Sequence, residues 1–311
     1  VTKISTSALA VMELMSQGKF ELDKTFGDYY PEYKNSNKAG LTFRDMLTHR
    51  SGLRAWIPFW MNCVDSVATV QKALRLHPEM ESMFIKEPER RTFWDKLFGR
   101  AQKYVINYEK SLAQNKELWK KALSTESITW HPGIFSNHKS EQYSVEIADT
   151  LFMNPARIDY ILKQIEVSAV NPKQGYVYSD LHYYTYPVFM ERITGKKWED
   201  FLKETYHGLG AYTLTYNPRR FFGLDRIVPT EKDTLFRKTQ IHGRVHDEGA
   251  GMLNGISGHA GLFGSANDLT KLMQMYLQGG SYGGEEYIRP EVLKEATSYQ
   301  FPEEGNRRGI A

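Results

Sequence analysis

The chain has 311 residues, 41% of them hydrophobic, and its 40 basic and 37 acidic residues give a formal net charge of +3. This length is ample for a sizeable core in one large or two small domains. The mild positive balance predicts neither a nucleic-acid nor a membrane partner. The sequence holds no run of about 18 apolar residues, so no membrane span is expected. A single cysteine, Cys63, excludes an internal disulfide bond.

The chain opens with a predicted helix that continues to Gln17 and ends at Gly18. Apolar residues recur in it with the spacing of one helical face: Ile4, Ala8, Val11, Leu14 and Met15. Lys3 and Ser7 are four residues apart and share a side of this helix, next to the apolar stripe. Burial and the helix dipole both favour a neutral amine at Lys3, which could accept a proton from a hydroxyl. In the alternative interpretation, the lysine extends along the surface to water.

Helices are predicted at intervals along the rest of the chain. Thr42 is the expected N-cap of a short helix over 41–48, with Asp45 three residues later. Pro187 is unfavourable inside the helix expected over 181–193. The full set of further helices is expected over 61–76, 91–123, 156–166, 181–193, 198–206, 269–277 and 290–297.

Lys3, Tyr178 and Asp180 form the first candidate site. A lysine in a suitable environment and a tyrosine hydroxyl can both act as general bases for a serine nucleophile. Such a serine must lie one helical turn before the lysine, and the position immediately before Val1 would give the spacing Ser-x-x-Lys. The residues alone leave alternatives open, because Tyr178 could be a packed ring and Asp180 a helix N-cap.

Histidines and carboxylates in the second half of the chain form a second candidate group: His242, His246, Asp247, Glu248 and His259. The four-residue spacing of His242 and His246 would suit two metal ligands on a helix. Gly243 lies between them, however, and no His-Glu-x-x-His motif occurs. A polar loop without a metal is therefore the favoured interpretation.

The aromatic stretch Trp56–Trp60 is the third candidate. Such rings can form a platform for a carbohydrate or a peptide, but runs of aromatic residues more often belong to a core. Both interpretations remain open from the residues alone.

Several of these segments together resemble the serine β-lactamase-like family, in its branch of class C β-lactamases, D-alanyl-D-alanine carboxypeptidases and esterases. Val1-Thr2-Lys3 and Gly18–Asp23 are similar to the beginning and end of the family's Ser-x-x-Lys helix. The segment 41–53 is similar to the family's "ile-thr-ile-arg-x-leu-leu-thr-his-thr-ser-gly-leu" motif. Tyr178-Ser179-Asp180 stands where the family has Tyr-x-Asn or Tyr-Ser-Asp. The segment 258–269 is similar to a glycine-rich turn that leads into a helix.

The sequence also departs from the family pattern. The resemblance places the nucleophilic serine immediately before Val1, and we expect the family's third motif, Lys-Thr-Gly or His-Thr-Gly, to lie beyond Ala311. His259-Ala260-Gly261 mimics that motif but precedes the helix after which the family has it. The expectation is therefore a truncated domain, inactive as it stands. Asp180 replaces the more usual asparagine, which argues against efficient hydrolysis of β-lactam antibiotics.

The resemblance implies an α/β fold of the β-lactamase/transpeptidase type, with an antiparallel sheet flanked by helices and an inserted helical lobe. Residues 1–311 would form one truncated domain, with the lobe at approximately 54–175. Lys3 and Tyr178 would be the catalytic base. Asp180, Trp56 and His259 are the expected substrate-binding residues, with Trp56 on the wall that the lobe contributes.

The resemblance further implies a serine hydrolase that cleaves an ester or an amide through an acyl-enzyme. The substrate would be a cell-envelope peptide or another small molecule such as an ester, and neither a cofactor nor a metal is expected. A periplasmic or other extracytoplasmic location in a bacterium is expected. Two alternatives remain: a non-catalytic binding module of the same fold and, less favoured, a metal-dependent hydrolase.

Overall fold

The computed structural model describes residues 1–79, 84–86, 104–106, 127–171, 175–305 and 307–310. The α-helices in these residues are α1 (Thr2–Ser5), α2 (Ser7–Ser16), α3 (Phe26–Tyr29), α4 (Phe43–Leu47), α5 (Ser66–Leu76), α8 (Ala156–Val167), α9 (Tyr186–Thr194), α10 (Trp198–Gly208), α11 (Glu248–Met252), α12 (Ala266–Leu277) and α13 (Pro290–Thr297). Short 3₁₀ turns include η2 (Met61–Cys63), η4 (Leu181–Thr185), η5 (Pro218–Arg220) and η6 (Leu224–Arg226), with η1 (Pro31–Tyr33) and η7 (Pro302–Glu304) near the two ends.

All strand pairs in the described residues are antiparallel and short. The strands are β1 (Phe84–Lys86), β2 (Tyr104–Ile106), β3 (Phe135–Ser136), β4 (Val145–Ala148), β5 (Leu151–Met153), β6 (Thr215–Tyr216), β7 (Glu231–Asp233), β8 (Thr239–Ile241), β9 (Leu262–Phe263), β10 (Ser281–Tyr282) and β11 (Glu285–Glu286). They pair as β1–β2, β3–β5–β4, β6–β9, β7–β8 and β10–β11. The expected mixture of helices and antiparallel strands is therefore confirmed.

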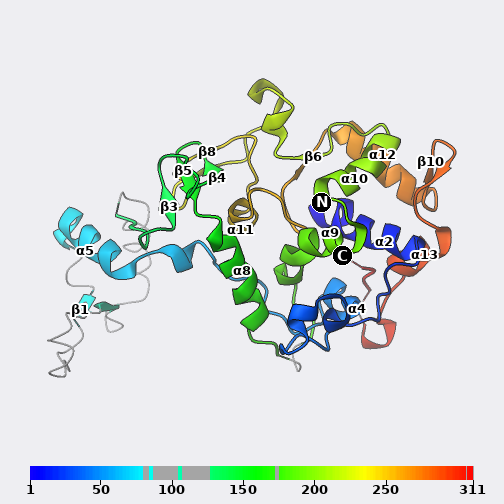
Figure 1. Ribbon diagram of the computed structural model, residues 1–311, viewed down its shortest axis with the longest axis horizontal. Coiled ribbons are helices and arrows are strands. Elements are labelled where there is room, and N and C mark those ends of the chain that lie inside the picture. The colour runs from blue at the N-terminus through cyan, green and yellow to red at the C-terminus, as the bar shows by residue number, and fades with distance from the viewer. Residues whose placement is uncertain (80–83, 87–103, 107–126, 172–174, 306, 311) are drawn as a thin grey trace.

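Two hydrophobic cores organise the described residues (Figure 1). The larger surrounds α2, which packs with α4, α9, α10, α12 and α13. The smaller joins α8, β4 and β5 to Phe59, Trp60 and Phe236. The described part of residues 54–175 thus contains strands as well as helices, and its core includes Phe236 from outside that range.

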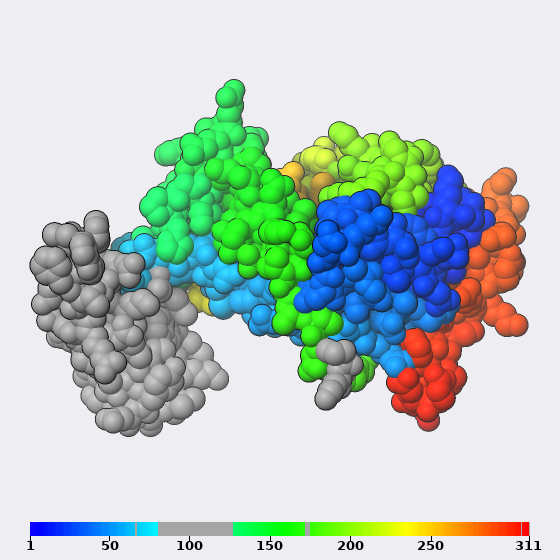
Figure 2. Space-filling model, turned by 60° about the horizontal axis from the view of Figure 1, so that its bottom comes forward, coloured from blue at the N-terminus to red at the C-terminus, as the bar shows by residue number. Residues whose placement is uncertain are grey.

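The helix α2 is buried on all sides, which a single apolar stripe does not predict. Every residue from Ser7 to Met15 is buried, including the carboxyl-bearing Glu13. The end of the chain covers part of this helix, because the Arg289 backbone N–H donates to Ser16 Oγ over 3.0 Å. Figure 2 shows the same proximity, with the blue N-terminal region beside the orange and red C-terminal region. Among the described helices, none is both long and apolar enough to cross a membrane.

The local sequence predicted several helices correctly. Thr42 caps α4 and its hydroxyl accepts from the Asp45 backbone N–H, as expected. The helix over 290–297 has the predicted bounds. The helix over 181–193 instead begins as the 3₁₀ turn η4, and α9 starts only at Tyr186. Pro187 then lies in the first turn of α9, where a missing backbone N–H removes no helical hydrogen bond.

The helix predictions over 61–76 and 91–123 also need correction. The predicted helix over 61–76 is divided into η2 and α5, because Asp65 breaks the run and caps α5 through the Ala68 backbone N–H. The predicted helix over 91–123 is wrong at 104–106, which form β2 and pair with β1. The other residues of that prediction lie outside the described part of the chain.

The predicted opening helix is interrupted at Thr6, whose φ of −128° and ψ of −78° separate α1 from α2. The expected placement of Lys3 and Ser7 on one continuous helical face is therefore wrong. Ser7 Oγ instead donates to the Gly258 carbonyl over 2.8 Å. A Cβ atom at Gly258 would lie 2.5 Å from Ser7 Oγ, so only glycine permits this close approach.

We predict that Glu13 makes the stability of the fold depend on pH. Burial raises its pKa to about 8 against the hydrogen bond from Thr205, which lowers it. The folded state then holds a proton that the unfolded state releases above its ordinary pKa of 4.5. The stabilisation is complete below that value, and is lost as the pH rises to about 8.

The measurement is the free energy of unfolding between pH 5 and pH 8, for the wild type and Glu13→Gln. The wild type should lose stability across this range, while the neutral glutamine should remove most of the slope. Glu141→Gln is the matched control, because Glu141 is exposed. Equal slopes in all three proteins would contradict the assignment.

Candidate active site

Lys3, Tyr178 and Asp180 lie together, although 175 residues separate the lysine from the tyrosine. Lys3 Nζ is 2.5 Å from Tyr178 Oη and 2.5 Å from Asp180 Oδ1. The side chains of Lys3 and Asp180 are 14% and 24% exposed, and Tyr178 is 46% exposed. An amine, a phenol and a carboxylate therefore meet where small molecules can reach the phenol.

Asp180, which the sequence groups with Lys3 and Tyr178, is the ion-pair partner of the lysine. In the structure the lysine amine also lies 4.5 Å from the centre of the Tyr178 ring and 5.2 Å from that of Tyr183. Aromatic faces and a carboxylate thus surround the amine and hold it in one place.

The segment 49–55 holds the loop that carries Tyr178 and Asp180. The Val177 backbone N–H donates to the His49 carbonyl over 2.9 Å, and the Asp180 N–H donates to the Ala55 carbonyl over 3.0 Å. Ser179 Oγ donates to the Arg54 carbonyl over 2.6 Å. These bonds fix the segment 176–180 without strand pairing.

Sequence reasoning missed the contribution of His49 to this arrangement. Its ring is buried and lies 4.4 Å from that of Tyr178, and its Nδ1 accepts from the Ser179 backbone N–H over 3.1 Å. The available signal was the motif at 41–53, which the sequence analysis used for resemblance alone and not for a role in the site.

The aromatic stretch Trp56–Trp60 divides into two environments. Trp56 is 56% exposed and follows Ala55, the residue whose carbonyl binds the Asp180 N–H. Phe59 and Trp60 are buried, and the Trp60 ring stacks on Phe236 with 5.5 Å between ring centres. The stretch as a whole is therefore no platform, and only Trp56 remains available for a substrate.

His259, one of the expected substrate-binding residues, is buried. Its side chain is 2% exposed and its ring stacks on Tyr184, with 4.3 Å between ring centres. Both ring nitrogens are engaged, Nδ1 with Ser257 Oγ at 2.7 Å and Nε2 with Asp247 Oδ1 at 3.0 Å. The histidine therefore fixes a turn and leaves no nitrogen for a substrate.

The candidate metal ligands are dispersed in the structure. His242 Nε2 lies 2.9 Å from the Leu224 carbonyl and 2.6 Å from that of Ile227. His246 Nε2 lies 3.6 Å from a Glu231 oxygen, whereas His259 Nε2 lies 3.0 Å from Asp247 Oδ1. Within the described residues, no group of three or more histidine, cysteine or acidic side chains is arranged to hold a metal ion.

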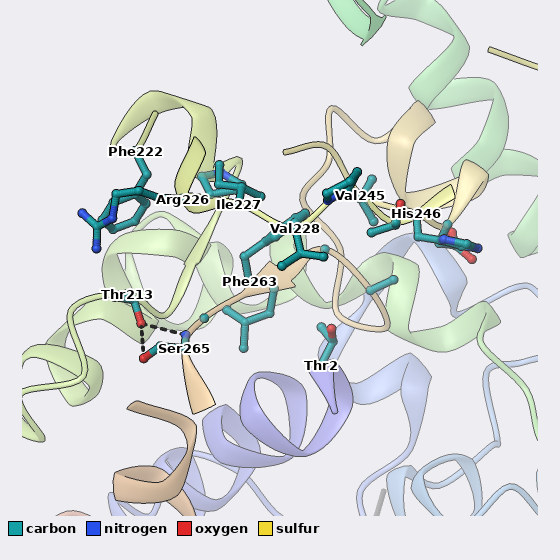
Figure 3. Close-up of a pocket in the computed structure, with 18 residues that line it drawn as sticks. Thr2, Thr213, Phe222, Arg226, Ile227, Val228, Val245, His246, Phe263 and Ser265 are labelled. Atoms are coloured by element: carbon teal, nitrogen blue, oxygen red, sulfur yellow. Dashed lines mark hydrogen bonds between the residues drawn. The ribbon is translucent and has the colours of Figure 1, made fainter. Parts of the chain in front are cut away.

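A cavity of about 730 Å³ lies beside the start of α1 (Figure 3). Thr2, which precedes Lys3 in the chain, lines the cavity together with Asp247. The charge of Lys3 favours the ionised form of the Asp247 carboxyl group. Burial opposes the ionised form of Asp247, but the hydrogen bond from His259 leaves its pKa below the ordinary value. Most of the remaining wall is apolar and includes Phe222, Ile227, Val228, Pro229, Val245, Leu262 and Phe263.

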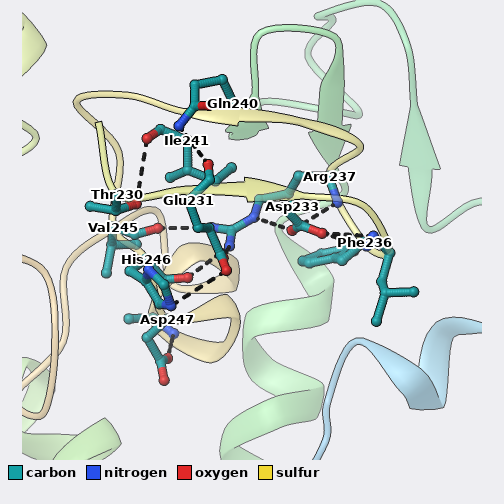
Figure 4. Close-up of polar contacts among 12 residues, drawn as sticks. Thr230, Glu231, Asp233, Phe236, Arg237, Gln240, Ile241, Val245, His246 and Asp247 are labelled. Carbon is teal, nitrogen blue, oxygen red and sulfur yellow. Dashed lines mark hydrogen bonds and ion pairs between the residues drawn. The ribbon is translucent and has the colours of Figure 1, made fainter. Parts of the chain in front are cut away.

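A buried arginine supports one wall of this cavity (Figure 4). The Arg237 side chain is 0% exposed and donates to the carbonyl groups of Val245 and His246 over 2.8 and 2.7 Å. Its Nε also donates to Asp233 over 2.7 Å, and its Nη2 to Glu231 over 3.1 Å. This network ties the hairpin β7–β8 to the backbone that lines the cavity.

Comparisons with known proteins agree with the motifs. Residues 1–88 match the family described as Beta-lactamase. A protein of Escherichia coli (strain K12), named "Putative D-alanyl-D-alanine carboxypeptidase", is 34% identical over 140 residues, which is 41% of this chain and 32% of the relative. A protein of the same name from Salmonella gallinarum is 35% identical over 139 residues, again 32% of its length. The chain thus aligns with about a third of each relative.

A solved structure supports the fold. The D-stereospecific amidohydrolase from a Streptomyces species shares 13% sequence identity, with a TM-score of 0.50 over 99% of this chain and 67% of its own. The expected resemblance to the serine β-lactamase-like family and the expected fold class are therefore confirmed.

We predict that Arg237→Leu destabilises the protein by about 3 kcal/mol, because it leaves Asp233 buried without its charged partner. Chemical denaturation of both proteins measures the difference. Arg219→Leu is the control, since Arg219 pairs with the exposed Asp149 and such pairs contribute about 0–1 kcal/mol. Similar losses in both variants would contradict a structural role for the buried network.

Proposed function

We propose that this protein is a serine hydrolase that cleaves an ester or an amide through an acyl-enzyme. The observation that carries the proposal is the 2.5 Å contact between Lys3 Nζ and Tyr178 Oη, made by residues that the family motifs assign to the base. The nucleophile in this proposal is the serine that the resemblance places immediately before Val1, one helical turn from Lys3.

The proton path follows from these positions. The serine hydroxyl gives its proton to the pair of Lys3 and Tyr178 as its oxygen attacks the substrate carbonyl. The pair returns a proton to the leaving alcohol or amine when the tetrahedral intermediate collapses. Water then gives a proton to the same pair as it attacks the acyl-enzyme. The pair returns a proton to the serine oxygen, and the acid leaves. Asp180 keeps Lys3 in place beside the phenol throughout.

The cavity and Trp56 support a substrate of moderate size with an apolar part. Thr2, which precedes Lys3 in the chain, lines the cavity, and the cavity walls are mainly apolar. Trp56 has an exposed ring and directly follows Ala55, whose carbonyl accepts from the Asp180 backbone N–H. We propose a cell-envelope peptide or a small ester as substrate. The names of the curated relatives support the peptide. We also propose an extracytoplasmic location, which rests on the resemblance to the family.

The test uses a fluorophosphonate probe on protein that contains the residue before Val1. Labelling should add the probe to that serine, and Lys3→Ala and Tyr178→Phe should each slow labelling at least about 100-fold, the effect of losing a general base. Tyr212→Phe is the matched control, because Tyr212 is exposed and lies outside the site. Labelling that is unchanged in Lys3→Ala would refute the assigned base.

Probe labelling, ligand affinity and the effect of a chelator together distinguish the alternatives. A binding module would retain affinity for its ligand and would never acquire the probe. A metal-dependent hydrolase would lose activity with a chelator, whereas the serine mechanism predicts no effect of chelation. The separate contacts of His242, His246 and His259 do not favour a metal mechanism.

A further prediction concerns β-lactam substrates. Asp180 is paired with Lys3 and cannot donate the amide hydrogen bond that an asparagine would offer. Steady-state assays should therefore show slow turnover of a chromogenic cephalosporin compared with a small aryl ester. Rapid cephalosporin turnover would contradict this expectation.

A further inference from the structure

His49 adopts an unusual backbone conformation next to the candidate site. Its φ of 60° lies in the left-handed region, which residues other than glycine rarely adopt. It comes two residues after the end of α4, and its carbonyl accepts the Val177 backbone N–H. This conformation directs the chain from the helix toward the loop that carries Tyr178.

The His49 side chain contacts the same loop in two further ways. Its ring lies 4.4 Å from the Tyr178 ring at an angle of 39°, while its Nδ1 accepts from the Ser179 N–H. Because Tyr178 is 46% exposed, its phenol is held mainly by the rings and the amine on its inner side. A single buried residue thus fixes the backbone on both sides of Tyr178 and packs against its ring.

The hydrogen bonding defines the state of the imidazole. Since Nδ1 accepts, the proton of the neutral ring is on Nε2, which is buried without a hydrogen-bond partner among the described residues. Burial, with Arg308 and Lys3 nearby, lowers the pKa of His49 to about 4, so the ring is neutral near pH 7. An unpartnered buried donor costs about 1–3 kcal/mol.

The two unfavourable features of His49 make a purely stabilising role a poor explanation. Strained φ values and unsatisfied buried groups persist mainly where the surrounding structure needs them for function. A glycine would relieve the backbone strain here, but it would lose both the acceptor for Ser179 and the ring against Tyr178.

We propose that His49 is a positioning residue that sets the orientation of the Tyr178 phenol toward the Lys3 amine. Its effect on catalysis rests on the proposed function, whereas its effect on the position of Tyr178 does not. The phenol must remain within hydrogen-bond reach of Lys3, and a displacement of about 1 Å can reduce a rate about 100-fold.

The test compares His49→Ala with His49→Asn. Alanine removes the ring and the acceptor, and it disfavours the left-handed conformation. Asparagine tolerates that conformation, and its side-chain oxygen can accept from the Ser179 N–H. His207→Ala is the matched control, because His207 contacts the exposed Tyr212 with 5.3 Å between ring centres, outside the site.

The first readout is the NMR signal of ¹³C-labelled tyrosine rings, with Tyr178 assigned through Tyr178→Phe. His49→Ala should shift the Tyr178 signal and leave that of Tyr212 unchanged, while His207→Ala should do the opposite. His49→Asn should lie between the wild type and His49→Ala. An unchanged Tyr178 signal in folded His49→Ala would overturn the proposal, whether or not the protein reacts with any probe.

The second readout is the rate of fluorophosphonate labelling, together with the melting temperature. His49→Ala should label about 10–100-fold more slowly, with partial rescue by asparagine. A merely structural histidine would lower the melting temperature and leave the labelling rate of the folded protein unchanged, which would overturn the proposed effect on catalysis. Absence of labelling in the wild type would refute the proposed function alone, because the NMR comparison still decides the position of Tyr178.

Discussion

The candidate site depends on backbone hydrogen bonds between two segments that are far apart in sequence. The carbonyl groups of His49, Arg54 and Ala55 fix the loop 177–180, and this loop then presents Tyr178 and Asp180 to Lys3. The same segment also approaches Asn171 closely at Gly52, because a Cβ atom there would lie 2.2 Å from the Asn171 carbonyl oxygen. The positions of Tyr178 and Asp180 beside Lys3 therefore depend on backbone hydrogen bonds between residues 49–55 and 177–180.

The sequence predicted best those features that are determined within a few residues. Thr42 caps its helix through the backbone N–H three residues later, and this geometry requires only local spacing. The meeting of Lys3 with Tyr178 was expected from family motifs, since nothing in their spacing of 175 residues indicates a contact. Their roles as a base remain a proposal.

The sequence left burial undecided where distant parts of the chain determine it. His259 was expected to bind substrate, and in the structure Tyr184 and Asp247 enclose its ring. The residues alone left open whether Trp60 belongs to a platform or to a core, and Phe236 covers it from a hairpin more than 170 residues away. A sequence pattern shows which side chains could bind a ligand, and long-range packing decides which of them face solvent.

The scaffold explains how the site can keep unfavourable features. His49 holds a left-handed backbone and a buried N–H without a partner, and such features would shift if the surroundings could relax. On one side α4 is fixed in the main core, while Arg237 fixes the hairpin wall of the adjacent cavity. The contacts that anchor these elements do not involve Lys3 or Tyr178, so the scaffold around the site does not depend on the proposed catalytic pair.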